Sequence, residues 1–241
     1  MELEAAGAKV SKYAVRESGD TLEIVERPHG GLSFVLVDGQ HTGHGAKTVS
    51  NMVARKAISM LAEGVRDGSA ARAAHDYLYT HYEGRVSAEL HIVSVDLVTK
   101  TIVISRNSHC PAIVGDAEGI RFLDEPSEPI GFHRRMKPVI AELPLQVHAI
   151  VIAFTDGILD AGLRYGQRFD VSSFVRSELY DSSGKPHPAA TARGLADAVL
   201  ARAIELDHGR PNDDSSVLVV RVVPRGTEDQ ARRVTVRFPI E

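Results

Sequence analysis

The 241-residue chain has no tryptophan, and its aromatic residues amount to only 5% of the total. Proteins that bind single-stranded nucleic acid commonly stack the bases on aromatic side chains, so the sequence gives little support to such a surface. A single cysteine, Cys110, excludes an intramolecular disulfide and any zinc site built from several cysteines. Scarce cysteine is typical of a reducing compartment, and we therefore expect a cytoplasmic protein.

Long apolar segments and blocks of like charge are also missing. The longest apolar run, at residues 149–154, is far shorter than the roughly 20 residues needed to cross a bilayer. The first residues, MELEAAGAKVSKY, are acidic and contain no apolar signal core. The formal net charge is −4, with acidic and basic residues interspersed. These features predict neither a membrane nor a nucleic-acid partner.

With 43% hydrophobic residues, the chain can bury a substantial core. No repeat, low-complexity tract or linker divides it, so we expect one domain over residues 1–241, with a core at about 9–223. The alternating segment ARRVTVRF predicts an additional edge strand at about 230–239.

The periodicity of the apolar residues predicts both strands and helices. The expected strands are at 9–16, 21–26, 32–37, 88–97, 101–106, 112–114, 120–123, 139–143, 147–154 and 215–223. The expected helices are at 43–64, 69–82, 171–179 and 189–206. Because most connections between strands are short, the pattern favours antiparallel sheets in a layered α+β fold, with helices on the outer faces.

The segment VDGQHTGHGAKT at 37–48 has the glycines, lysine and threonine of a phosphate-binding loop. A P-loop requires the pattern G-x-x-x-x-G-K-[ST]. Here Ala46 precedes Lys47, and His41 stands where the first glycine is required. Nucleotide binding through Lys47 stays open as an alternative, but the segment also begins with an aspartate, Asp38.

Aspartates recur at the ends of the expected strands, namely Asp20, Asp38, Asp156 and Asp213. Carboxylates that converge at one rim of a sheet are costly to bury together unless a cation holds them. Oxygen-only ligands favour Mg²⁺ or Mn²⁺ over zinc. The alternative is that these aspartates, three of them beside a glycine, simply form turns.

Six short motifs in this sequence resemble, in the same order, those of the metal-dependent serine/threonine protein phosphatases of type 2C. They are Ser18-Gly19-Asp20, Asp38-Gly39 with Gly43-His44-Gly45, Asn107-Ser108-His109-Cys110-Pro111, Pro129-Ile130-Gly131, Phe154-Thr155-Asp156-Gly157 and Asn212-Asp213-Asp214. The resemblance is greatest to the bacterial branch of SpoIIE- and RsbX-like phosphatases, and it covers roughly residues 11–223. It implies a four-layer α-β-β-α sandwich of two antiparallel sheets with two metal ions at one end.

The resemblance also implies roles for individual residues. Asp38, the central catalytic residue, would bridge two Mn²⁺ or Mg²⁺ ions, and the Gly39 carbonyl would bind the second ion. Asp156 and Asp213 would hold the first ion, while Asp20 would support the second. Water activated between the ions would attack phosphorus directly.

Five further residues have more than one interpretation. His44 and His41 are candidates to protonate the departing oxygen, or they simply belong to the loop and the helix start. Arg16 and His41 are candidates for contact with the substrate phosphate. Asp160 and Asp214 are candidates for a third, weakly held metal ion or for capping turns.

The function implied by the resemblance is hydrolysis of phosphoserine or phosphothreonine on another protein. That partner would be a phosphorylated regulator in a stress or sigma-factor pathway, and the oligomeric state stays open. The alternative is a pseudo-phosphatase that binds a phosphoprotein without turnover. Because no covalent phosphoenzyme is implied, Cys110 should be dispensable for hydrolysis and is interpreted as a small buried residue.

Overall fold

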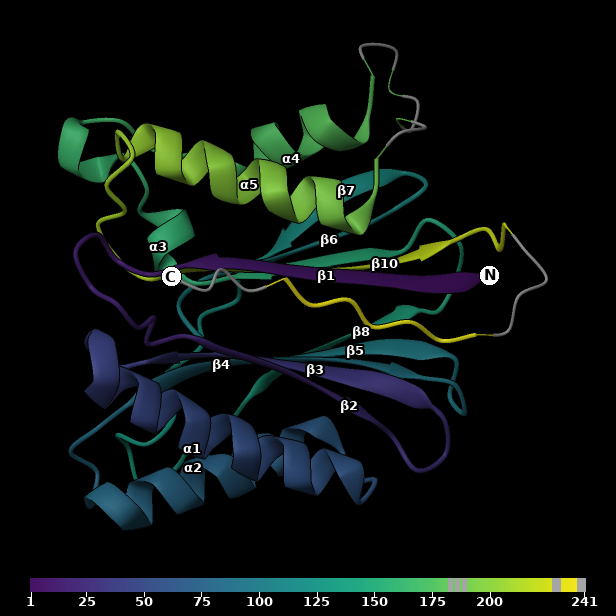
Figure 1. Ribbon diagram of the computed structural model, residues 1–241. Helices are drawn as coiled ribbons and strands as arrows, with labels where there is room; N and C mark the ends of the chain where they lie inside the picture. The colour runs from purple at the N-terminus through teal and green to yellow at the C-terminus, as the bar shows by residue number, and fades with distance from the viewer. Residues whose placement is uncertain (182–183, 185–186, 188–189, 227–230, 238–241) are drawn as a thin grey trace.

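The computed structural model describes residues 1–181, 184, 187, 190–226 and 231–237. Two five-stranded antiparallel sheets lie face to face, and helices cover the outer face of each (Figure 1). This arrangement confirms the predicted α+β class and the four-layer α-β-β-α sandwich.

The first sheet has the strand order β1-β10-β9-β6-β7. Its strands are β1 (Glu2–Val10), β10 (Ser215–Val223), β9 (Ile150–Phe154), β6 (Ala112–Asp116) and β7 (Gly119–Leu123). The outer layer over this sheet is formed by α3 (Asp156–Leu159), a 3₁₀ turn (Leu163–Tyr165), α4 (Val171–Leu179) and α5 (Ala192–Leu206). Strands β9 and β10 are buried on both faces, which explains why their sequences are apolar almost without interruption.

The second sheet has the strand order β2-β3-β4-β5-β8. Its strands are β2 (Thr21–Glu26), β3 (Gly31–Gly39), β4 (Ala88–Asp96), β5 (Thr101–Asn107) and β8 (Val139–Pro144). Two helices cover it, α1 (Gly43–Ala62) and α2 (Asp67–Tyr82). Over the described part of the chain, none of the helices is both long and apolar enough to span a bilayer.

The side chains of β3 show how the layers are held together. Phe34 and Leu36 point between the sheets and join the central core, whereas Val35 and Val37 pack against the helices. All four are at most 1% exposed. A strand with both faces covered in this way needs a continuous apolar run, and burial of each such side chain contributes about 1.5 to 3 kcal/mol to folding.

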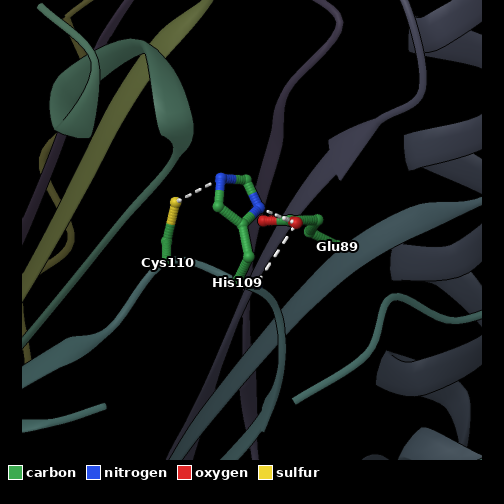
Figure 2. A group of neighbouring side chains, drawn as sticks. All are labelled: Glu89, His109 and Cys110. Carbon is green, nitrogen blue, oxygen red and sulfur yellow. Dashed lines mark hydrogen bonds and ion pairs between the residues drawn. The ribbon is translucent and has the colours of Figure 1, made fainter. Parts of the chain in front are cut away.

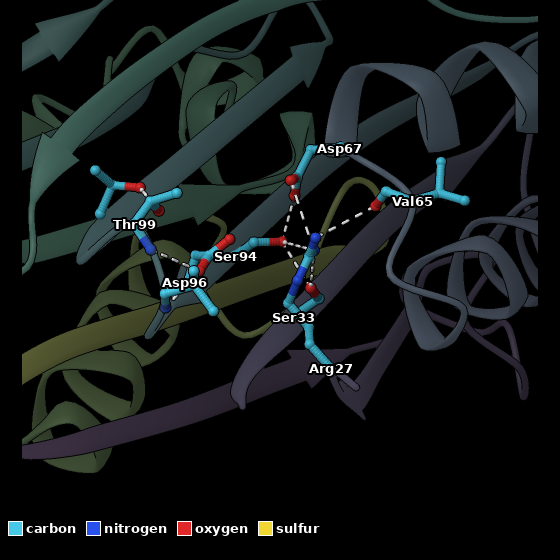
Figure 3. Close-up of polar contacts among 9 residues, drawn as sticks. Arg27, Ser33, Val65, Asp67, Ser94, Asp96 and Thr99 are labelled. Carbon is cyan, nitrogen blue, oxygen red and sulfur yellow. Dashed lines mark hydrogen bonds and ion pairs between the residues drawn. The ribbon is translucent and has the colours of Figure 1, made fainter. Parts of the chain in front are cut away.

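A buried polar network ties the connection between α1 and α2 to the second sheet (Figure 3). Arg27 Nη1 lies 3.6 Å from Asp67 Oδ2 and donates a hydrogen bond to Ser33 Oγ at 3.1 Å. Arg27 Nη2 donates to the Val65 carbonyl oxygen at 3.3 Å, and Ser94 Oγ donates to Asp67. The side chains of Arg27 and Asp67 are 9% and 7% exposed, so this charge pair is largely removed from water.

Most predicted elements are confirmed to within a few residues, but the strand predicted at 9–16 is wrong. The first strand is instead β1, and residues 11–20 form turns. The chain leaves the sheet after Val10 because the next backbone amides find other partners. The Lys12 amide donates to Asp214 Oδ1 at 2.9 Å, and the Tyr13 amide donates to the Pro211 carbonyl oxygen at 2.9 Å.

The edge strand predicted at about 230–239 is also wrong over the described residues 231–237, which are not assigned to a strand. The remaining positions of that prediction lie outside the described residues. Val234 and Val236 are 80% and 79% exposed, so their alternation covers no sheet face. The segment is held near β2 through an exposed ion pair, in which Arg232 Nη1 lies 2.9 Å from Glu26 Oε2.

Candidate metal centre

A cleft of about 210 Å³ lies at the end of the sandwich where β3 and β9 finish. Five residues singled out in the sequence line it, namely Asp38, Gly39, His41, Asp156 and Asp213. Asp38 is near the end of β3, Asp156 follows β9 at the start of α3, and Asp213 precedes β10. The two sheets therefore bring side chains together that are up to 175 positions apart in the chain.

The carboxylates at the cleft repel one another and are poorly solvated. Burial raises the pKa of Asp38 to about 10, and the charges of Asp20 and Asp156 contribute to the increase. Burial, followed by repulsion from Asp213, raises the pKa of Asp156 to about 6. The pKa of Asp213 is raised as well, chiefly by burial. Two positive charges act in the opposite direction, Lys12 on Asp213 and His109 on Asp156, but the pKa values of both aspartates are still raised.

Asp20 lies behind the cleft and is fully buried. Its Oδ2 atom accepts hydrogen bonds from Ser216 Oγ at 2.6 Å and from Thr155 Oγ1 at 3.0 Å. Its Oδ1 atom has no hydrogen-bond partner among the described residues. Burial raises the pKa of Asp20 to about 7, although the two hydroxyl donors act in the opposite direction.

These observations test whether the residues fit a divalent cation. A buried carboxylate oxygen without a hydrogen-bond partner destabilises the folded protein, and so does a group of carboxylates with raised pKa values. A bound cation would remove both sources of instability. The donors are carboxylate oxygens, which are the ligands that Mg²⁺ and Mn²⁺ prefer. The residues therefore fit hard divalent cations.

Gly39 allows the end of β3 to approach α1. A Cβ atom at this position would lie 2.1 Å from the backbone carbonyl oxygen of Ala46. We expect Gly39→Ala to lower the free energy of unfolding by about 1 to 3 kcal/mol, because the strand and the helix must move apart.

Urea unfolding of Gly39→Ala would measure this change, with Gly45→Ala as the matched control. No atom lies within 4 Å of a Cβ at Gly45, which is in α1. That control should be neutral or gain up to about 1 kcal/mol, because alanine favours a helix. Equal stabilities for the two variants would contradict the close approach at Gly39.

Two sequence candidates do not line the cleft. The side chain of His44 is 89% exposed, and its Nδ1 atom lies 3.2 Å from Glu17 Oε2. His44 is in the first turn of α1, where the buried face of the helix starts with Ala46 and Val49 and leaves His44 outside. Arg16 is exposed in the turn that precedes β2.

The two candidates for a third metal ion differ in their surroundings. Asp214 is buried, and its two carboxylate oxygens accept hydrogen bonds from the Lys12 and Gly19 amides, both at 2.9 Å. Asp214 therefore anchors the turns before β2. Asp160 is exposed at the end of α3.

Lys47 does not have the surroundings of a P-loop lysine. Its Nζ atom donates to the Asp20 carbonyl oxygen at 2.6 Å and to Thr21 Oγ1 at 2.9 Å, so it fixes the start of β2. The loop before α1 follows a strand of an antiparallel sheet, whereas a P-loop belongs to a parallel strand–loop–helix unit. The structural premise of the nucleotide-binding alternative is therefore wrong.

Glu89, which no sequence motif singled out, also lines the cleft. It lies directly across from Asp38 in the pairing of β3 with β4. Its carboxylate accepts hydrogen bonds from Ser108 Oγ at 2.5 Å and from the His109 amide at 3.2 Å, and it also contacts His109 Nδ1 (Figure 2). Burial alone would raise the pKa of Glu89, but the donors on His109 and Ser108 lower it. The available signal was an acidic residue between two apolar residues near the start of the strand.

Three solved structures share this fold. The PP2C phosphatase domain with a regulatory-domain fragment of the cell-fate determinant SpoIIE from Bacillus subtilis gives a TM-score of 0.75 at 18% identity, over 92% of this chain and 64% of that chain. The structure of the RsbU and RsbW domains of a Mycobacterium tuberculosis protein gives a TM-score of 0.71 at 18% identity. The match covers 92% of this chain and 61% of that chain. The catalytic domain of the serine/threonine phosphatase PstP, in complex with two manganese ions, gives a TM-score of 0.67 at 13% identity. The match covers 92% of this chain and 99% of that chain. The fold is that of the PP2C class.

The chain belongs to the SpoIIE family, because the family model described as Stage II sporulation protein E matches residues 28–223. Family and fold together confirm the resemblance seen in the motifs. The chain spans slightly less than two thirds of the Bacillus subtilis chain. No curated protein gives a match.

Proposed function

We propose that this chain hydrolyses phosphoserine or phosphothreonine on a protein substrate and that it depends on two bound divalent cations, Mn²⁺ or Mg²⁺. The observation that carries the proposal is the group of aspartates at the cleft. Their pKa values are raised by burial and mutual repulsion, and one buried oxygen of Asp20 lacks a partner. A fold of the PP2C class and membership of the SpoIIE family support the same chemistry.

The residues that would hold the cations are those that the resemblance in the motifs implies, and Asp38, Asp156 and Asp213 among them line the cleft. Asp38 would be the central ligand, Asp156 and Asp213 would hold one cation, and Asp20 with the Gly39 carbonyl would support the other. When bound, such cations supply activation of water and compensation of charge on the phosphoryl group. The carboxylates would hold these cations beside the cleft, where the phosphorylated side chain of a substrate would enter.

Of the histidines near the cleft, His41 is the better candidate to donate a proton to the departing serine oxygen. It lines the cleft, whereas His44 is exposed and paired with Glu17. Asp160 is the better candidate for a third, weakly held cation, because the oxygens of Asp214 already accept two backbone amides. Arg16, being exposed, is available to a phosphate on a docked substrate.

We further propose that the substrate is a phosphorylated regulatory protein in the cytoplasm. Support comes from the similarity to SpoIIE, whose structure carries the description of a cell-fate determinant with a regulatory domain. The scarcity of cysteine supports a reducing compartment.

The test is hydrolysis of p-nitrophenyl phosphate and of a phosphoserine peptide with Mn²⁺, with Mg²⁺ and with EDTA. We expect turnover that requires a cation and that falls at least about 100-fold in Asp156→Asn, as when a key electrostatic group is removed. Asp197→Asn, which alters an exposed carboxylate on α5, should match the wild type. Cation binding without phosphate release would instead support a phosphoprotein-binding module.

A further inference from the structure

Exposed arginine and aromatic side chains gather beside the acidic cleft. Three segments supply them, at 11–20, 160–170 and 207–213, and these segments lie at the same end of the sandwich as α3 (Figure 1). We call this group the arginine–aromatic surface, and its members are Tyr13, Arg164, Tyr165, Arg168, His208 and Arg210. We propose that this surface binds acidic residues that flank the phosphorylated residue of a substrate protein. The inference rests on the proposed function, because it names what the same cleft selects.

Side-chain contacts join the three segments of the arginine–aromatic surface. Arg210 Cζ lies 5.3 Å from the centroid of the Tyr13 ring. The ring centroids of Tyr165 and His208 are 4.2 Å apart. A guanidinium over an aromatic ring is held in orientation by the ring, while the N–H groups at its edge stay available to a carboxylate. The surface is therefore arranged before a partner arrives.

A buried carboxylate connects this surface to the cleft. One oxygen of Asp207 accepts a hydrogen bond from the Gly162 amide at 2.9 Å, and the other accepts one from the Asn212 amide at 2.9 Å. Asn212 directly precedes Asp213, which lines the cleft. Arg210 is three positions before Asp213, so their Cα atoms are at most about 11 Å apart. An acidic residue a few positions from a phosphoserine in the cleft would therefore reach the surface.

The positive charge of the surface is not compensated by the chain itself. None of its three arginines forms an ion pair with a described residue. The acids close to them in the sequence have other partners. Asp170 accepts a hydrogen bond from the Ser173 amide at 3.0 Å, and Glu205 pairs with Arg202. The arginines are therefore available to an external carboxylate, which matches the planar arrangement of their donors.

A phosphorylated peptide with acidic neighbours suits the cleft and the surface together. Its phosphate would enter the cleft, and its carboxylates would pair with the arginines. Basic residues beside the cleft also raise the local concentration of an anionic substrate. Nucleic acid fits less well, because its evenly spaced phosphates would also lie against the carboxylates of the cleft.

The first test is peptide binding in EDTA, which needs no turnover. The probe is a fluorescent phosphoserine peptide with three aspartates on each side, compared with the same peptide carrying asparagines. Fluorescence anisotropy should show about 10-fold tighter binding of the aspartate peptide, because several weak exposed ion pairs act together. Equal binding of the two peptides by the wild type would overturn the proposal. So would tighter binding of single-stranded DNA than of the aspartate peptide, which would assign the surface to nucleic acid.

Substitution of the three arginines should remove this preference. We expect the variant that combines Arg164→Gln, Arg168→Gln and Arg210→Gln to bind the two peptides equally. Arg193→Gln is the matched control, since it replaces an exposed arginine at the other end of α5 and should keep the preference. An undiminished preference in the triple variant would overturn the proposal. Thermal unfolding would show that both variants are folded.

Charge reversal separates recognition from any loss of folding. The variant that combines Arg164→Glu, Arg168→Glu and Arg210→Glu should prefer a peptide with lysines in place of the aspartates, a result that partial unfolding does not produce. Retention of the preference for aspartate would contradict the proposal.

Hydrolysis with Mn²⁺ keeps this inference distinct from the proposed function. The wild type should show about 10-fold higher kcat/KM for the aspartate peptide, mainly through KM, and the glutamine triple variant should lose that difference. Hydrolysis of p-nitrophenyl phosphate, which has no flanking residues, should be equal in the two proteins. A folded triple variant that loses this activity would overturn the inference, since the surface would then act on the cleft itself. Failure of the wild type to hydrolyse any substrate would count against the proposed function, and peptide binding would still decide the role of the surface.

Discussion

Asp38→Asn is expected to reduce hydrolysis by at least about 10³-fold, comparable to the loss of a principal electrostatic group in other active sites. The same change should stabilise the cation-free protein. The Asp38 carboxylate is buried beside Asp20 and Asp156, and burial with their charges raises its pKa to about 10. An amide at this position stays uncharged without taking up a proton and preserves the shape, so function and stability should change in opposite directions.

The gain in stability should depend on pH in a defined direction. A carboxylate whose pKa is higher in the folded protein than its ordinary value of 3.8 binds its proton more tightly in the folded state. The stability it contributes is complete below pH 3.8 and is lost as the pH rises through the folded pKa. Between pH 4 and pH 8, the free energy of unfolding of the wild type should therefore fall relative to that of Asp38→Asn.

Thermal unfolding in EDTA measures this difference. At pH 8 we expect the free energy of unfolding of Asp38→Asn to exceed that of the wild type by about 1 to 2 kcal/mol, which raises Tm by about 2 to 8 °C. At pH 4 the two proteins should differ little. Adding Mn²⁺ should stabilise the wild type more than the variant, because the cation binds the folded state. Asp197→Asn serves as the control for losing any carboxylate. A lower Tm in Asp38→Asn under EDTA would show that the carboxylate is already compensated without a cation.

Arg27→Ala is expected to cost about 3 to 5 kcal/mol of unfolding free energy, because it leaves the carboxylate of Asp67 buried without its charged partner. For a chain of this size the corresponding fall in Tm is about 6 to 20 °C. The expectation rests on the low exposure of both side chains and on the several hydrogen bonds that the guanidinium makes (Figure 3).

Two further variants distinguish loss of the pair from loss of side-chain volume. Arg27→Met with Asp67→Leu removes both charges together and should recover most of the stability, since no uncompensated charge stays buried. Arg232→Ala removes an exposed pair with Glu26 at the end of the neighbouring β2 and should cost no more than about 1 kcal/mol. If Arg27→Ala lowers the free energy of unfolding by no more than Arg232→Ala does, the buried network does not stabilise the fold as described.

Local sequence pattern was sufficient for much of the fold. The apolar run at β3 and the helical spacing of α1 each reflect side chains a few residues apart, and both elements formed where expected. Two aspartates followed by glycine at the ends of strands, Asp38 and Asp156, also marked residues that line the cleft, because a strand end is a local feature. The order of the short motifs was enough to indicate the family.

Other features depended on contacts between distant parts of the chain. The first strand ends at Val10 because Asp214, 202 positions after Lys12, takes the next amide. The segment at 231–237 alternates like a strand but pairs with neither sheet. Periodicity cannot contain this information, since it reports which faces a segment could bury and says nothing of its partners.

Short spacings between residues were enough to predict the layered α+β class, the family and the aspartates of the cleft. Which neighbouring residues complete the site depends instead on contacts between distant segments. Glu89 reaches the cleft because β4 pairs with β3 in a register that places it opposite Asp38. Asp214 accepts hydrogen bonds from backbone amides, and the side chain of His44 faces solvent. Register, burial and the direction of each side chain are set by the packing of distant segments, so no local pattern records them.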